Sequence, residues 1–245
     1  MMTTNIQEVV GILDRSGSMA GKEEDTVGGI NSMIRVLKEN ADTSDIINVS
    51  IKLFDHEEKL LWNSKPLSEV TSLDIKEFIP RGQTALLDAL GRTLNYFMEK
   101  RLMDPNAYSS CLVYVATDGY ENASRLYSRE YLKTLIQRAK EKYNIEVIYL
   151  GANQDAILEA SNLGINPDQA INYTESSETT QAVYSAVGRV ASSQRSNPSN
   201  NIAFLPAERQ ASQPAPPTAI PPPIVRAVGL TPSYSNVLYE PSATI

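Results

Sequence analysis

The chain has 245 residues, enough for one α/β domain, and its 42% of hydrophobic residues is ordinary for a globular protein. Its net charge of −7 argues against nucleic-acid binding, which needs a basic face. A single cysteine excludes a disulfide framework within the chain, and no apolar run approaches the roughly 18 residues that span a bilayer. Since no signal peptide precedes the first apolar run, we expect a cytoplasmic protein without membrane contact.

The first half of the chain predicts two strands, a helix between them and a hairpin. An apolar run over residues 9–13 indicates a buried strand, and helical spacing of apolar residues indicates a helix from about 25 to 40. Residues 45–54 form the next predicted strand. The turn at 55–57 then leads into a short return strand over 58–62, which places one antiparallel strand at the edge of the sheet.

The second half alternates regularly between strands and helices. Alternation of this kind is typical of a parallel sheet covered by helices. The predicted elements are an amphipathic helix between Thr84 and Pro105, strands at 111–117, 145–150 and 169–173, and helices at 129–143, 156–162 and 178–192. The sequence therefore predicts an α/β fold with a doubly wound, mostly parallel sheet of six strands, one of them an antiparallel edge strand, and helices on both faces.

The composition changes sharply near Ser196. Residues 196–245 contain ten prolines and only four charged residues, and this density of proline opposes helices and central strands. We therefore expect a domain at 1–195 followed by an extended, Pro-rich tail at 196–245. The tail is either idle and disordered or, because it carries recurrent apolar residues, an arm that docks on a partner or on another copy of the protein.

Oxygen-bearing side chains lie at the ends of three of these predicted elements. Asp14, Ser16 and Ser18 come directly after the first strand, Thr84 precedes a helix, and Asp118 follows the strand at 111–117. Each group alone has a simpler interpretation, as helix caps or a turn. Together they would lie at one edge of a parallel sheet and supply hydroxyl and carboxylate ligands. We therefore predict a Mg²⁺ site, with Mn²⁺ or Ca²⁺ as alternatives.

Other chemically notable residues fit structural roles better. His56 is the single histidine, in the predicted hairpin turn, and we place it at the wrong edge for a Ser/His/Asp triad. A lone histidine also argues against the usual zinc sites. Cys111 is predicted to be a buried strand residue. Glu121 and Asn122 either shape the rim of the metal site or are turn residues, and the second interpretation is favoured.

The three segments Asp14–Met19, Gly82–Leu86 and Thr117–Gly119 resemble the three parts of a metal-ion-dependent adhesion site. This site belongs to the von Willebrand factor type A domain family, and all of its expected positions are filled in the expected order. The resemblance covers about residues 6–193, and a weaker likeness points to small intracellular members from bacteria and their viruses. It implies that Ser16, Ser18 and Thr84 bind the metal directly, while Asp14 and Asp118 bind it directly or through water.

The predicted site favours binding over catalysis. Neutral hydroxyl ligands leave an ion much of its positive charge, so it would seek an Asp or Glu carboxylate from a protein partner. The main hypothesis is therefore a metal-dependent protein-binding module that is not an enzyme. One alternative is a structural component of a larger assembly, in a virion if the chain is phage-encoded, docked through the tail. A metal-dependent phosphate hydrolase is a third hypothesis, but it lacks a general base.

Overall fold

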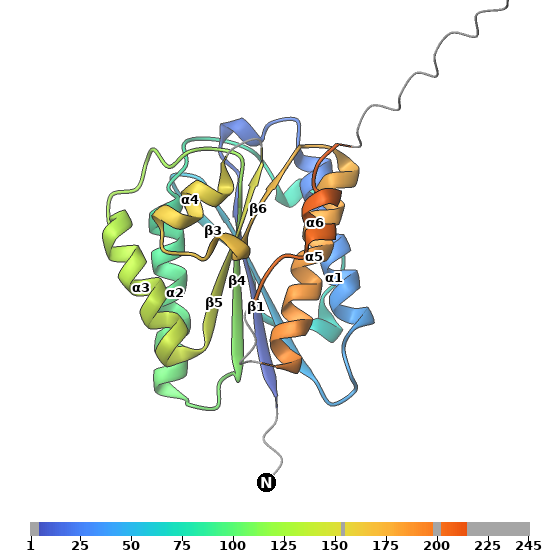
Figure 1. Ribbon diagram of the computed structural model, residues 1–245, viewed down its shortest axis with the longest axis vertical. Helices are drawn as coiled ribbons and strands as arrows, with labels where there is room; N and C mark the ends of the chain where they lie inside the picture. Colours follow the sequence, from blue (N-terminus) through green and yellow to red (C-terminus); the bar gives the residue numbers. More distant parts are fainter. Residues whose placement is uncertain (1–4, 153–154, 198–201, 215–245) are drawn as a thin grey trace, which may run out of the picture. The chain divides into compact units, whose positions relative to one another are not determined.

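The computed structural model describes residues 5–152, 155–197 and 202–214, which contain a six-stranded sheet with helices on both faces (Figure 1). The strand order is β3-β2-β1-β4-β5-β6, and every neighbouring pair is parallel except β2 and β3. The strands are β1 (Ile6–Asp14), β2 (Ile46–Phe54), β3 (Glu58–Pro66), β4 (Ser110–Thr117), β5 (Ile145–Ala152) and β6 (Ala170–Tyr173). The predicted fold class, with its antiparallel edge strand, is confirmed.

The helices divide between the two faces of the sheet (Figure 1). On one face, α1 and α5 pack against each other and against the sheet; on the other lie α2, α3 and α4. The helices are α1 (Glu23–Glu39), α2 (Leu86–Met103), α3 (Arg129–Tyr143), α4 (Ala156–Asn162), α5 (Ser177–Ser196) and α6 (Pro206–Ala211). Each face has its own hydrophobic core, so the central strands are apolar on both sides.

The central strands bring the ends of β1 and β4 together. The two strands are parallel neighbours, with Leu13 beside Ala116, so Asp14 and Asp118 emerge at the same carboxyl edge. Strand β2 ends at this edge too, because Phe54 pairs with Asp14. The topology thus gathers the loops after three adjacent strands at one place, which is where α/β sheets bind ligands.

The chain after Ser196 differs from the predicted extended tail. Residues 202–213 fold back on the domain, with Ile202 and Phe204 buried in the core on the α1–α5 side. Helix α6 begins at Pro206, a first-turn position where the missing N–H costs no hydrogen bond. The compact unit accordingly runs to Pro214, past the predicted domain boundary at 195/196. The rest of the predicted tail, 215–245, lies outside the described residues.

A salt bridge and several hydrogen bonds hold this segment in place. Arg189 of α5 pairs with Glu208 of α6, and the guanidinium of Arg209 donates to the backbone oxygens of Ala170, Pro167 and Asp168. Proline density alone predicts an extended tail, but the buried apolar residues of 202–204 and these charged side chains hold the segment against the domain.

Among the described residues, no helix is both long and apolar enough to cross a membrane.

Candidate metal centre

The five residues predicted to bind metal come together at the carboxyl edge of the sheet. Asp14 and Ser16 are buried at the end of β1, and Thr84 is buried just before α2. The Asp118 side chain is 2% exposed after β4, while Ser18 lies at the surface. A site of mostly buried oxygen groups with one open side is suited to hold an ion and still admit a further ligand.

Direct hydrogen bonds connect four of these residues. The hydroxyl oxygens of Ser16 and Ser18 are 3.0 Å apart, and Ser18 donates to Oδ1 of Asp118 at 2.6 Å. Asp14 accepts the N–H of Ser16 on Oδ1 at 2.7 Å and the hydroxyl of Thr117 on Oδ2 at 2.5 Å. These bonds orient both carboxylates toward the hydroxyl groups.

Gly119 shows where the remaining ligand, Thr84, stands relative to the others. A Cβ atom placed on Gly119 would lie 3.3 Å from Oγ1 of Thr84, 3.4 Å from Oγ of Ser18 and 3.8 Å from Oδ2 of Asp14. Oxygen atoms from the Asp14 loop and the Thr84 loop therefore surround one small volume that Gly119, in the Asp118 loop, leaves open. Hydroxyl and carboxylate oxygens are hard donors, so the set fits a cation such as Mg²⁺.

The Asp14 carboxylate lies in a mixed environment. Burial raises the pKa of Asp14, and the hydrogen bonds from Thr117 and Ser16 partly oppose that rise. Asp118 also interacts with Lys22, whose ammonium contacts both Asp118 and Glu175. Burial lowers the pKa of Lys22, but these two carboxylates outweigh it and the net pKa is raised. Lys22 is therefore a fixed positive charge beside the predicted ligands.

Sequence reasoning missed the residues that hold the three loops together. Asp55, fully buried after β2, accepts a hydrogen bond from Arg81 at 3.0 Å. Nε of Arg15 lies 2.9 Å from the same carboxylate, without the angle of a hydrogen bond, so this contact is an ion pair. The N–H of Arg81 in turn donates to the carbonyl of Arg15, and that of Gly17 to Gly82. Asp55 thus anchors the Asp14 loop and the Thr84 loop.

The predicted place of His56 is wrong. His56 is exposed, as expected, but it lies at the carboxyl edge beside the Thr84 loop. Gly82 has a φ of 71°, and a Cβ there would fall 2.2 Å from Nδ1 of His56. The hairpin follows the end of β2, so its turn shares the edge with Asp14. Only the strand order reveals this proximity.

Glu121 and Asn122 do more than form a turn. Asn122 accepts the N–H of Thr84 at 2.9 Å, and Glu121 accepts the N–H of Leu87 in the first turn of α2 at 3.0 Å. The favoured interpretation of these residues as turn residues therefore understated them. They fix the Thr84 segment to the loop that carries Asp118, a contact over more than 30 residues that local patterns do not report.

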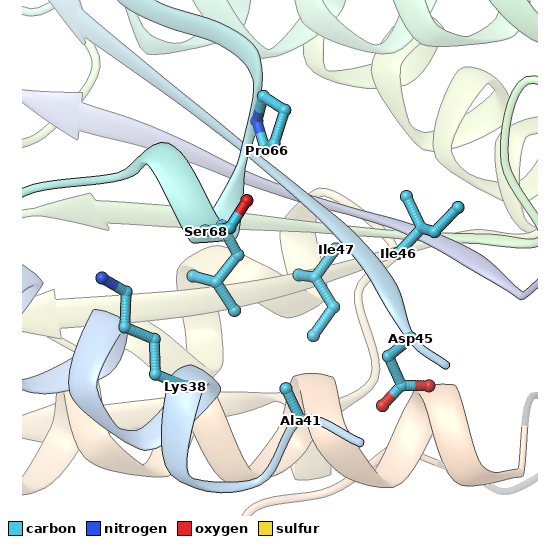
Figure 2. A pocket seen from close by; sticks show the side chains of 8 residues that line it. Lys38, Ala41, Asp45, Ile46, Ile47, Pro66 and Ser68 are labelled. Atoms are coloured by element: carbon cyan, nitrogen blue, oxygen red, sulfur yellow. The ribbon is translucent and has the colours of Figure 1, made fainter. Parts of the chain in front are cut away.

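Cys111 and a hollow at the opposite end of β2 lie apart from this site. Cys111 is fully buried in β4, as predicted, and burial raises the pKa of its thiol well above the ordinary value. A hollow of about 460 Å³ lies near the amino end of β2 (Figure 2). Its charged residues are already engaged, since Lys38 donates to the carbonyl of Val70 and Asp45 pairs with Arg195. The hollow therefore offers no competing site.

Comparison with known proteins finds a family and a fold. The family model of the von Willebrand factor type A domain matches residues 8–187. No curated protein matches.

Solved structures with a similar fold include members of this family. Proximal thread matrix protein 1 from the mussel byssus, with zinc in its MIDAS motif, is 16% identical with a TM-score of 0.53, covering 77% of this chain and 46% of that one. A von Willebrand factor type A protein from Catenulispora acidiphila is 14% identical with a TM-score of 0.55, over 77% and 43% of the two chains. Manganese-loaded TRAP protein from Plasmodium vivax is 17% identical with a TM-score of 0.50, over 71% and 70%. The chain spans less than half of the first two.

Proposed function

Because the chain belongs to the von Willebrand factor type A domain family, we propose that it is a metal-dependent protein-binding module. One observation carries the proposal. Oxygen atoms of Thr84, Ser18 and Asp14, from loops distant in sequence, surround the single small volume beside Gly119. The carboxylate of Asp118 and the hydroxyl of Ser16 join them through hydrogen bonds.

In this proposal Ser16, Ser18 and Thr84 hold the ion directly, and Asp14 and Asp118 do so directly or through water. Mg²⁺ is the expected ion because the donors are all hard oxygens and Mg²⁺ keeps several waters. Two similar structures carry zinc and manganese, so Mn²⁺ is a practical probe of the site here. When bound, the ion supplies a positive charge that an acidic side chain can reach.

The charges of the ligands favour an acidic partner. The direct ligands Ser16, Ser18 and Thr84 are neutral hydroxyls, so an ion that meets Asp14 and Asp118 through water keeps much of its positive charge toward an incoming ligand. An Asp or Glu carboxylate from a partner offers both the charge and an oxygen donor for an open position. The site thus selects a protein surface that presents an acidic residue.

The same contacts disfavour catalysis. A hydrolase needs a general base near its bound substrate. Asp14 already accepts two hydrogen bonds, and Asp118 accepts from Ser18 and Lys22. Neither carboxylate is placed to take a proton from water, and binding is the function that these groups support.

The comparisons do not favour the alternative of a structural component docked through the tail. That alternative depends on the predicted tail at 196–245, of which residues 215–245 lie outside the described part of the chain. Self-association through that segment, and the cytoplasmic or virion location, stay predictions.

Isothermal titration with Mg²⁺ and Mn²⁺ tests the metal site. The wild-type protein should bind one ion, and a Ser16→Ala/Ser18→Ala double variant should not. A pull-down from native lysate, with and without a chelator, then tests the partner: metal-dependent capture supports the binding module. Equal titration of wild type and double variant, or capture that a chelator leaves unchanged, contradicts it.

A further inference from the structure

Lys22 occupies a position that local helix preferences do not explain. It precedes the first turn of α1, where the side chain usually caps the helix, but it makes no capping hydrogen bond. A positive charge is also unfavourable next to a helix amino terminus. Residues that break a local rule tend to serve a site. The side chain of Lys22 instead reaches Asp118 and Glu175.

The two oxygens of Asp118 face different partners. Oδ1 accepts the hydroxyl of Ser18, the predicted metal ligand, whereas Oδ2 contacts the ammonium of Lys22. The side chain is 2% exposed, so water screens the contact weakly. A cation on the Ser18 side and the ammonium of Lys22 would therefore share one carboxylate.

Glu175 keeps the ammonium in this place. Its Oε1 lies 2.5 Å from Nζ of Lys22, and the Glu175 side chain is 22% exposed. The segment is anchored on both sides, since Thr174 donates its N–H to the carbonyl of Ser212 and Ser176 caps α5 by accepting the N–H of Thr179. The ammonium of Lys22 thus contacts carboxylates from two separate segments of the chain, Asp118 and Glu175.

We infer that Lys22 is a built-in counter-cation of the metal site, which balances Asp118 and Glu175 and weakens the binding of the divalent ion. This inference rests on the proposed function, because it concerns the regulation of that same site. A fixed ammonium near the ion repels it and competes for Asp118. The site then fills only when the free metal concentration is high, and partner binding follows that concentration.

Titration of Mn²⁺ into wild type and Lys22→Met tests the inference. Lys22→Met should bind Mn²⁺ about tenfold more tightly, because a positive charge next to the ion is removed. Lys142→Met, the same change of charge at an exposed residue of α3, should stay within about twofold of wild type. Glu175→Gln should act in the opposite direction, since Lys22 then interacts with Asp118 alone.

A second variant background distinguishes direct competition of Lys22 for Asp118 from a general electrostatic effect of the Lys22 charge. In Asp118→Asn, the gain from Lys22→Met should fall to less than about threefold, because the shared carboxylate is gone. Thermal unfolding gives a readout without metal: in EDTA, Lys22→Met should melt below wild type, and Mg²⁺ should raise its midpoint by more. Lys22→Gln replaces it if Lys22→Met does not fold.

The outcomes distinguish the inference from the function on which it rests. If wild type binds Mn²⁺ and Lys22→Met binds it with the same affinity, the counter-cation is overturned while the metal site stands. If the full gain persists in Asp118→Asn, competition for Asp118 is overturned. If neither wild type nor Lys22→Met binds Mn²⁺, the proposed function itself fails.

Discussion

At the carboxyl edge of the sheet, Asp14 and Asp118 face hydroxyl groups, whereas Asp55 and Glu57 one strand away face guanidinium groups. Within the described residues, the carboxylates of Asp55 and Glu57 and the ring of His56 form the one close group of His, Cys, Asp and Glu ligands. By a count of such ligands, that group would be the metal site.

The counter-charges reverse this ranking. Arg81 contacts both carboxylates of the Asp55 group, and Arg15 contacts Asp55, so positive charge already occupies it. The Asp14 group has neutral hydroxyls on three sides and one ammonium at its margin. The comparison teaches that the groups around a carboxylate decide between a structural cluster of ion pairs and a cation site. The ion pairs of Asp55 and Glu57 with Arg15 and Arg81 are called the lock below.

The largest effect is expected from breaking the lock. Asp55→Asn removes the negative partner of buried Arg15, and removal of one member of a buried ion pair costs about 3 to 5 kcal/mol. The free energy of unfolding, measured in urea, should fall by this amount. Metal affinity should fall too, because Asp55 anchors the Asp14 and Thr84 loops. A variant as stable as wild type would show that the lock is unimportant.

The next largest effect is expected on metal binding, from removal of a predicted ligand. Asp14→Ala should reduce Mg²⁺ affinity by more than about 100-fold while the fold stays intact, because the buried ligand that is lost lies at the end of β1, outside the two hydrophobic cores. Isothermal titration and circular dichroism measure the two parts. Ser16→Ala and Thr84→Ala should each weaken binding less. An unchanged affinity in Asp14→Ala would refute the site.

Filling the open volume should also block the ion, with every ligand still present. Gly119→Ala places a methyl group between 3.3 and 3.8 Å from three ligand oxygens, and Mg²⁺ affinity should fall by at least about tenfold. Gly17→Ala is the matched control, because its nearest neighbour would be the Gly82 carbonyl at 3.5 Å, an ordinary contact. Equal affinities in the two variants would mean that the ion lies elsewhere.

The smallest effect is expected at the exposed side of the lock. Glu57→Gln removes the partner of Arg81 at the surface, where both side chains are about half exposed or more. Exposed ion pairs contribute little to stability. The thermal midpoint and the Mg²⁺ affinity should both match wild type. A marked loss of either would show that the Arg81 contact with Asp55 depends on Glu57.

The sequence alone predicted the layers, the order of strands and helices along the chain, and that five oxygen-bearing residues gather at the candidate metal centre. These properties are local: apolar periodicity reports which residues are buried, and hydroxyl and carboxylate groups stand at recognisable strand ends. Several boundaries agree to the residue, such as those of α3 at 129–143. The return strand β3 proved longer than expected, because pairing with β2 continues past irregularities near Ile51.

Only the tertiary structure decided which charges meet. Lys22 and Asp118 are 96 residues apart, and Arg81 and Asp55 are 26 apart, so no local pattern links them. Likewise, residues 202–213 pack on the domain because of a few buried side chains and two arginines, against their proline-rich composition. The sequence identifies each carboxylate, but the function of a carboxylate depends on the cation that folding places beside it.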